Sequence, residues 1–220
     1  MPICITHSLH DGRCGMKYRY IVIERQYGSG GTEIGRLLSE LTSILCYGAE
    51  ILESVSKKLI IPVSDIQRYE ESVTNSLLYS LYAIGTMNDG TGSVISKEDR
   101  IFLEEQRMIR EYAMQGSAIF VGRCAASALE QEYVLSVFIH ADDAFRKKRI
   151  MEEYGIAEKA VSGTMAKFDK KRSHYYYANT GKKWDDPSNY QITLDSGKLG
   201  TKACAEIIKA AWICGADSDV

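Results

Sequence analysis

A glycine-rich loop near the start of the chain has the residue types that hold phosphate. Residues 25–32 read Arg-Gln-Tyr-Gly-Ser-Gly-Gly-Thr. Glycines let backbone N–H groups crowd around an anion, and the N-terminus of a following helix adds roughly half a positive charge. We therefore predict a phosphate-binding loop made by Gly28, Ser29, Gly30, Gly31 and Thr32.

The loop departs from the common phosphate-loop pattern, G-x-x-x-x-G-K-[ST]. With Gly30 on the second glycine, Thr32 falls on the serine or threonine, where its hydroxyl could reach Mg²⁺. Arg25 then replaces the first glycine, and Gly31 replaces the lysine. Because losing one charge-assisted contact costs roughly 1.5–3 kcal/mol, we take Arg25 as the candidate substitute cation. The alternative is a tight turn that leads into a helix and binds nothing.

The flanking residues predict a strand before the loop and a helix after it. Residues 20–24, Tyr-Ile-Val-Ile-Glu, form a β-branched apolar run typical of a buried strand. After the loop, apolar residues recur at i, i+3, i+4 and i+7, which is one face of a helix. These residues are Ile34, Leu37, Leu38 and Leu41.

Composition indicates a globular protein with one α/β domain, or one domain with an insert. The 220 residues are 45% apolar and 25% charged, which is ordinary for a soluble fold. The chain has no run of about 20 apolar residues, so we expect no membrane span. The first residues lack the apolar core of a secretion signal, and the six cysteines have no framework spacing. We therefore expect reduced thiols and a cytoplasmic protein.

Charge is concentrated in one segment of the sequence. Residues 146–183 contain 11 Lys and Arg against 4 Asp and Glu, whereas the rest of the chain contains 16 against 25. A basic segment in an acidic protein favours a local anionic ligand over a nucleic-acid footprint, which would make a whole face basic. The alternative is a solvated helix surface.

The remaining sequence predicts alternating strands and helices. We expect residues 1–18 to be a flexible tail, because the cysteines and histidines at 4, 7, 10 and 14 fit no common zinc spacing. Residues 49–115, which include helical spacing within 65–85 and a loop at 87–93, have the size of an insert that could cover a substrate. Expected strands are 43–47, 117–121, 134–139 and 190–194, and expected helices are 50–59, 96–115, 143–154, 157–177 and 201–212.

Three arginines stand where an anion could be bound. Arg123 follows the predicted strand 117–121, and ligands of open α/β sheets sit beyond the carboxyl ends of strands. Arg146 and Arg149 are i, i+3 neighbours on the helix that Asp142 can cap. For Arg123 the alternative is a surface salt bridge.

Asp169 and Arg172 are three residues apart on the longest predicted helix and share one side. They could form a plain helix salt bridge, worth about 0.2–0.5 kcal/mol. They could also form a base-and-phosphate clamp, since arginine forks onto phosphate and aspartate accepts from an amino group.

Several pieces of sequence, in order, resemble the cytidylate kinase-like family, relatives of bacterial cytidylate kinase. The resemblance covers about residues 20–210. The matching pieces are the loop 25–34, Val-Gly-Arg-Cys-Ala at 121–125, Val-Phe-Ile-His-Ala at 137–141 with Phe-Arg at 145–146, Asp-Lys-Lys-Arg at 169–172 with Tyr-Tyr at 175–176, and residues 177–190 from Tyr-Ala-Asn-Thr-Gly to Asn-Tyr.

The resemblance implies a phosphate-loop NTPase-type α/β/α fold over residues 19–213, with a five-stranded parallel sheet, a helical acceptor-binding insert at 49–115 and a lid at 142–165. It implies MgATP on the loop, with Thr32 on the Mg²⁺, and transfer of the γ-phosphoryl group to a nucleoside monophosphate, CMP or dCMP first. By the same resemblance Arg123 would hold the acceptor phosphate. Asp169 and Arg172 would read the base and its phosphate, and Arg146 and Arg149 would belong to the lid.

The sequence also departs from the family. Gly31 replaces the loop lysine, as in this subfamily generally. Gly48 stands where relatives often carry aspartate, and Met165 stands where cytidylate kinases proper have a further arginine. Two alternatives therefore stay open. One is a nucleotide-binding protein with weak or no kinase activity, and the other is a kinase for another small acceptor. Neither a nucleic-acid partner nor a membrane is expected, and the sequence indicates no oligomeric state.

Overall fold

A single parallel sheet organises the molecule. The computed structural model describes residues 18–72 and 97–214. Its five strands pair in the order β2-β3-β1-β4-β5, and all neighbours are parallel. The predicted α/β class with a five-stranded parallel sheet is confirmed. The strands are β1 (Tyr20–Arg25), β2 (Leu45–Tyr47), β3 (Ala118–Val121), β4 (Val134–His140) and β5 (Ile192–Asp195).

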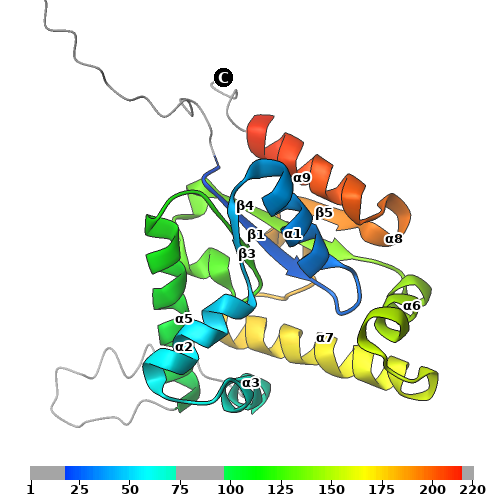
Figure 1. The fold of residues 1–220 in the computed structure, drawn as a ribbon, viewed down its shortest axis with the longest axis horizontal. Coiled ribbons are helices and arrows are strands. Elements are labelled where there is room, and N and C mark those ends of the chain that lie inside the picture. The colour runs from blue at the N-terminus through cyan, green and yellow to red at the C-terminus, as the bar shows by residue number, and fades with distance from the viewer. Residues whose placement is uncertain (1–17, 73–96, 215–220) are drawn as a thin grey trace, which may run out of the picture.

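Helices cover both faces of the sheet. Helices α1 and α9 lie on one face and α2 and α5 on the other, while α7 crosses beyond the carboxyl ends of the strands (Figure 1). The helices are α1 (Gly31–Thr42), α2 (Ala49–Leu59), α3 (Val63–Ser72), α5 (Lys97–Met114), α6 (Asp143–Tyr154), α7 (Glu158–Thr180), α8 (Ser196–Leu199) and α9 (Thr201–Cys214). Short 3₁₀ turns are η2 (Ala125–Ala128), η3 (Gln131–Tyr133) and η4 (Pro187–Asn189).

Strand β1 is buried on both sides, as its apolar run predicts. Tyr20 and Val22 pack with α2 and α5, whereas Ile21 and Ile23 pack with α1 and α9. Successive side chains of a strand point to opposite faces, so a strand between two helical layers is apolar at every position. The run places the end of β1, and the loop after it, at the centre of the carboxyl edge.

Most predicted elements are present with shifted ends. Strand β2 begins at Leu45, because Ser43 is left-handed (φ 57°) at the end of α1. Helix α7 continues to Thr180, where Gly181 ends it with φ 70°. Strand β5 begins two residues later than expected, at Ile192. The expected tail, the helical spacing at 77–84, the loop at 87–93 and the start of the helix at 96 lie outside the described residues, apart from Tyr18.

The described residues contain neither a candidate membrane span nor a candidate metal cluster. No helix there has the length and apolar character needed to cross a bilayer. Within the same ranges, no group of three or more His, Cys, Asp or Glu residues could hold a metal ion. The cysteines and histidines at 4–14 fall outside those ranges.

Candidate active site

The loop between β1 and α1 has the shape of a phosphate cradle. Gly28 and Gly30 have φ of 79° and 81°, a left-handed conformation that favours glycine. A Cβ on Gly28 would lie 2.8 Å from the carbonyl oxygen of Arg146. The Ile34 N–H bonds to the Gly30 carbonyl over 2.9 Å, so the helical N–H groups before it have no partner within the helix. These groups face the end of the loop, where an anion would sit.

Arg25 explains both departures from the phosphate-loop pattern. Its side chain runs between Gly31 and Gly122. A Cβ on Gly31 would lie 2.5 Å from the Cβ of Arg25, and a Cβ on Gly122 would lie 2.1 Å from its Nη1. An arginine at the first glycine position therefore excludes a lysine at the usual place. The Nε of Arg25 is buried without a hydrogen-bond partner.

A cavity of about 370 Å³ opens beside the loop, at the carboxyl ends of β1 and β3 and under α7. Its volume is in the usual range for small-molecule sites. Gln67 of α3 and the aromatic residues Phe168, Tyr175 and Tyr176 of α7 line it. Its charged lining consists of four cations and one carboxylate, namely Arg25, Arg123, Lys171, Arg172 and Glu24.

Arg123 enters this pocket from a strained turn. Gly122, Arg123 and Cys124 have φ of 80°, 65° and 50°, three left-handed residues in succession. Such strain in residues other than glycine costs about 1–3 kcal/mol each and gathers at functional sites. The Nη1 of Arg123 lies 3.4 Å from Glu105 Oε1, and the hydroxyl of Tyr175 donates to the other oxygen of that buried carboxylate. The turn and the carboxylate together aim a half-buried guanidinium at the pocket.

Arg172 links the pocket to the phosphate loop. Its Nη1 donates to the carbonyl oxygen of Arg25 over 2.9 Å, and its guanidinium lies 5.5 Å from the ring centroid of Tyr27. Burial, and next the positive charge of Arg25, lower the pKa of Arg172 to about 9. Burial also lowers the pKa of Arg123, and Arg25 adds to this shift. Arg25 therefore repels both Arg123 and Arg172 in a desolvated place, and a bound anion would relieve this repulsion.

Glu24 is a pocket residue that sequence reasoning missed. It ends the buried part of β1 and is only 6% exposed. Its carboxylate accepts from the Nε1 of Trp184, at 3.3 Å, and from the backbone N–H of Cys124. Burial raises the pKa of Glu24, and the charge of Arg25 opposes this shift. An acidic residue closing an otherwise apolar buried strand was the signal available in the sequence.

Asp169 lies outside the pocket, against the phosphate loop. Its Oδ1 accepts from the backbone N–H of Tyr27 over 2.7 Å, and its Oδ2 accepts from Arg146 at 2.5 Å. Arg146 is 6% exposed and also bonds Asp143 over 2.9 Å. The ring of Tyr27 is stacked on Phe168, with centroids 4.4 Å apart. The two residues predicted to act as one clamp thus face different places, Arg172 the pocket and Asp169 the loop.

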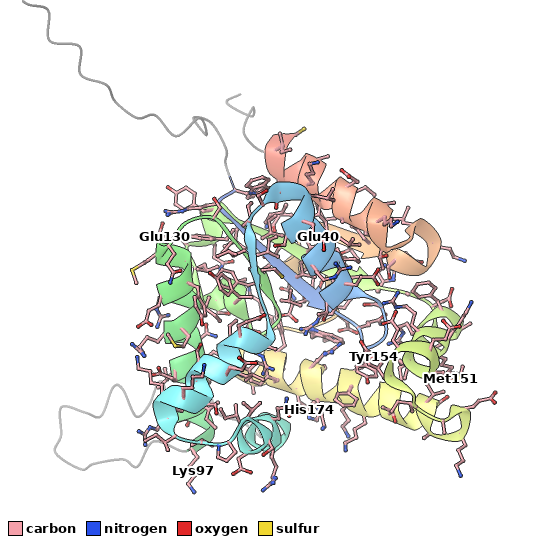
Figure 2. The ribbon with its side chains drawn as sticks, viewed as in Figure 1. Glu40, Lys97, Glu130, Met151, Tyr154 and His174 are labelled. Atoms are coloured by element: carbon pink, nitrogen blue, oxygen red, sulfur yellow. The ribbon has the colours of Figure 1, made fainter. Side chains whose placement is uncertain are left out.

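The two predicted lid arginines both border the loop. Arg146 Nη1 lies 3.4 Å from the carbonyl oxygen of Tyr27. Arg149 has its Cζ 3.3 Å from the place of a Cβ on Gly30, and it bonds Glu33 over 2.8 Å. The Tyr27 ring is also stacked on Tyr154, which lies at the end of α6 (Figure 2), with centroids 5.4 Å apart. Thr32 is exposed in the first turn of α1.

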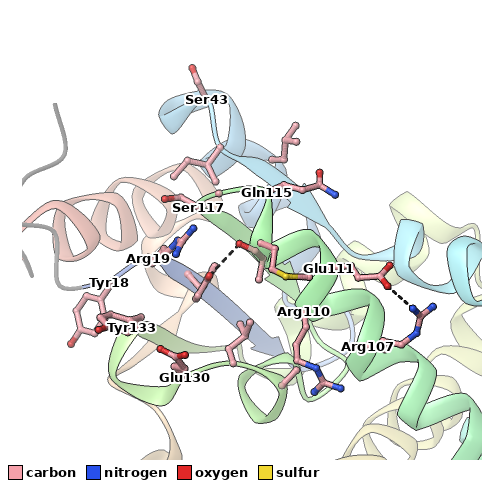
Figure 3. A pocket seen from close by; sticks show the side chains of 18 residues that line it. Tyr18, Arg19, Ser43, Arg107, Arg110, Glu111, Gln115, Ser117, Glu130 and Tyr133 are labelled. Carbon is pink, nitrogen blue, oxygen red and sulfur yellow. Dashed lines mark hydrogen bonds and ion pairs between the residues drawn. The ribbon is translucent and has the colours of Figure 1, made fainter. Parts of the chain in front are cut away.

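A second, larger cavity of about 1200 Å³ lies at the opposite, amino-terminal edge of the sheet. Figure 3 shows its mixed lining, with Arg19, Arg107, Arg110 and Glu111 among the labelled side chains and an ion pair between Arg107 and Glu111. No motif predicts this cavity. It contains none of the predicted site residues.

Comparison with known proteins decides the family. A family model described as the cytidylate kinase-like family matches residues 20–198. The chain belongs to the cytidylate kinase-like family. The match spans β1, the loop, helices α6 and α7, and β5, so the predicted resemblance is confirmed. No curated protein sequence matched the chain.

Solved structures similar to this family member include kinases. An uncharacterized protein from Eubacterium ventriosum ATCC 27560 is 26% identical, with a TM-score of 0.65 over 88% of this chain and 97% of that chain. Shikimate kinase from Acinetobacter baumannii, in complex with shikimate, is 12% identical, with a TM-score of 0.51 over 93% and 97%. TT1252 from Thermus thermophilus is 13% identical, with a TM-score of 0.50 over 88% and 96%. The last two likenesses show a shared fold.

Proposed function

We propose that this cytidylate kinase-like protein transfers the γ-phosphoryl group of MgATP to a nucleoside monophosphate, with CMP or dCMP as the first candidates. One observation carries the proposal. Arg25 belongs to both halves of the site, since its side chain passes Gly31 of the phosphate loop and also lines the pocket with Arg123 and Arg172. A donor and an acceptor phosphate would therefore meet at one cation.

The residues of the loop fit the phosphates of a nucleoside triphosphate. Gly28 and Gly30 leave the backbone open, and the first turn of α1 offers unpartnered N–H groups. The exposed hydroxyl of Thr32 would help to hold Mg²⁺, which neutralises phosphate charge when it is bound. Arg25 would supply the positive charge that a loop lysine supplies elsewhere.

The pocket fits the phosphate of the acceptor. Arg123 and Arg172 come from different elements, and each loses solvation and is repelled by the charge of Arg25. A bound dianion would offset that cost through charge-assisted, forked hydrogen bonds. Lys171 would add a further cation at the same wall.

The chemistry requires positioning and charge neutralisation. An oxygen of the acceptor phosphate attacks the γ-phosphorus, the bond to the ADP oxygen breaks, and no protein nucleophile takes part. Arg25 and Arg149 would offset the charge that spreads over the transferred group. We propose that Arg146 and Asp169 fix the backbone of Tyr27 and so the shape of the loop.

The experiment measures ADP release from MgATP with CMP, dCMP, UMP, AMP or GMP, and with no acceptor. We expect turnover that depends on CMP or dCMP and falls at least 100-fold in Arg25→Met, a loss typical for a group that stabilises transition-state charge. The matched control is Arg36→Met, because Arg36 is an exposed arginine on α1 that pairs with Glu40. Turnover in the control and not in Arg25→Met excludes a contaminating kinase.

Absence of turnover with every acceptor would reject this proposal. ATP binding without turnover would favour a nucleotide-binding protein. Turnover with a different small anion would favour another acceptor, which the four cations of the pocket would also bind.

A further inference from the structure

The pocket contains one carboxylate among its described lining residues, Glu24. A carboxylate is an acceptor of hydrogen bonds, so it does not bind the acceptor's phosphate. Its place on the pocket wall, close to the charge of Arg25, calls for a different role. That role concerns the uncharged part of the acceptor molecule.

Two hydrogen bonds from the protein fix the Glu24 carboxylate. The Nε1 of Trp184 and the backbone N–H of Cys124 each donate to it. An ionised carboxylate has about four lone-pair sites, so acceptor capacity is left for a group inside the pocket. The two donors come from the turn after β3 and from the segment after α7, so two separate parts of the chain orient the carboxylate.

The other candidate for reading a base is engaged elsewhere. Asp169 uses one oxygen on the Tyr27 N–H and the other on Arg146. It is absent from the pocket lining. Releasing it would leave the buried guanidinium of Arg146 without one of its two carboxylate partners, which is costly.

We propose that Glu24 is the specificity-determining residue of the acceptor site, where its carboxylate accepts a hydrogen bond from the exocyclic amino group of the base. This inference rests on the proposed function. Cytosine presents an N4 amino donor, whereas uracil presents a carbonyl oxygen at that position. A carboxylate facing that carbonyl would pair two acceptors, so the site selects CMP over UMP.

A plain counter-ion role for Glu24 makes a different prediction. Neutralising Arg25 and Arg172 would change the affinity for every anionic acceptor by the same factor. CMP and UMP carry the same phosphate and sugar, and their rings have nearly the same size. Their affinity ratio therefore separates reading of the base from general electrostatics.

The test is calorimetric binding of CMP and of UMP to the full chain, without ATP, so that it does not depend on turnover. We expect the wild type to bind CMP at least 10-fold more tightly than UMP. In Glu24→Gln the ratio should fall below about threefold, because the amide can turn its NH₂ toward the uracil carbonyl. Equal binding of CMP and UMP by the wild type, an unchanged ratio in Glu24→Gln, or no binding of CMP would each overturn the inference.

The matched control is Glu105→Gln, a second buried carboxylate, which contacts Arg123 and does not line the pocket. It should weaken CMP and UMP alike and keep their ratio. If Glu24→Gln fails to fold, the wild-type ratio and the ratio in Glu24→Asp still decide. A selective wild type without any turnover would leave this inference standing while the proposed kinase function fails.

Discussion

The backbone N–H of Tyr27 donates to Oδ1 of Asp169 over 2.7 Å, which ties the phosphate loop to helix α7. The other carboxylate oxygen binds Arg146 of α6, and Phe168 stacks on the Tyr27 ring. One turn further along α7, Arg172 lines the pocket. A single helix thus holds the phosphate loop with Asp169 and lines the pocket with Arg172, so movement of α7 would affect both.

This relationship makes Asp169→Asn a test of loop positioning. We expect the KM for ATP to rise about 10-fold and the KM for the acceptor to change less than threefold, because the lost charge anchors Arg146 and the loop. The free energy of unfolding should fall by about 1–3 kcal/mol, since a buried guanidinium loses a charged partner. Asp143→Asn is the control, because that carboxylate binds the same arginine but is 67% exposed. An effect confined to the acceptor would restore the base-reading role of Asp169.

Arg25 and Gly31 should behave as one unit. Gly31→Lys alone is expected to lower the unfolding temperature and abolish ADP release, because its Cβ would lie 2.5 Å from the Cβ of Arg25. Arg25→Gly combined with Gly31→Lys produces the full phosphate-loop pattern, and we expect it to recover much of the loss. In a double-mutant cycle the coupling should be about 0.5–3 kcal/mol.

Gly163→Ala is the steric control for that cycle, since nothing lies within 4 Å of its Cβ position on α7. It should raise stability, by up to about 1 kcal/mol. Strict additivity of the two loop substitutions would show that Arg25 does not exclude the lysine.

Local sequence patterns predicted what local physics decides. The run 20–24 gave a buried strand because every position is apolar or β-branched until Glu24. Asp142 caps α6 by accepting from the N–H of Phe145, three residues on, as its position indicates. The glycines at 28 and 30 predicted the loop, because a tight turn needs left-handed φ angles and glycine adopts them without strain.

Contacts between distant segments could not be predicted in the same way. Asp169 and Arg172 share a side of α7, yet Asp169 bonds a backbone 142 residues away. Glu24 depends on Trp184, which lies 160 residues further along the chain. The exclusion of a lysine by Arg25 needs the path of its side chain across the loop, which no spacing rule gives.

Glu105 should make stability depend on pH. Burial raises its pKa to about 8, from 4.5 when the chain is unfolded. Between these values the folded state holds the proton more tightly, so stability should fall as pH rises from about 4.5 to about 8, by at most about 1.4 kcal/mol per pH unit. Glu105→Gln replaces the titrating carboxyl with an amide and should therefore remove this pH dependence.

Urea unfolding at pH 5, 6, 7 and 8.5 measures that dependence. The free energy of unfolding of Glu105→Gln should increase steadily, relative to that of wild type, as the pH rises to 8.5. Glu53→Gln, at an exposed position of α2, is the control and should run parallel to wild type. Parallel curves for Glu105→Gln would show that its pairing with Arg123 keeps the carboxyl ionised throughout.

Arg172→Ala should separate the acceptor from the donor in the opposite direction to Asp169→Asn. Its guanidinium lines the pocket, and in the proposed site it would fork onto the acceptor phosphate. We therefore expect the KM for the acceptor to rise at least 10-fold and the KM for ATP to change less than threefold. Arg172→Lys should recover part of this loss, because it keeps the charge without the fork. Lys170→Ala, an exposed neighbour on α7, is the control. Equal loss for both substrates would mean that Arg172 acts through its bond to the Arg25 carbonyl, and the pocket would then need another phosphate ligand.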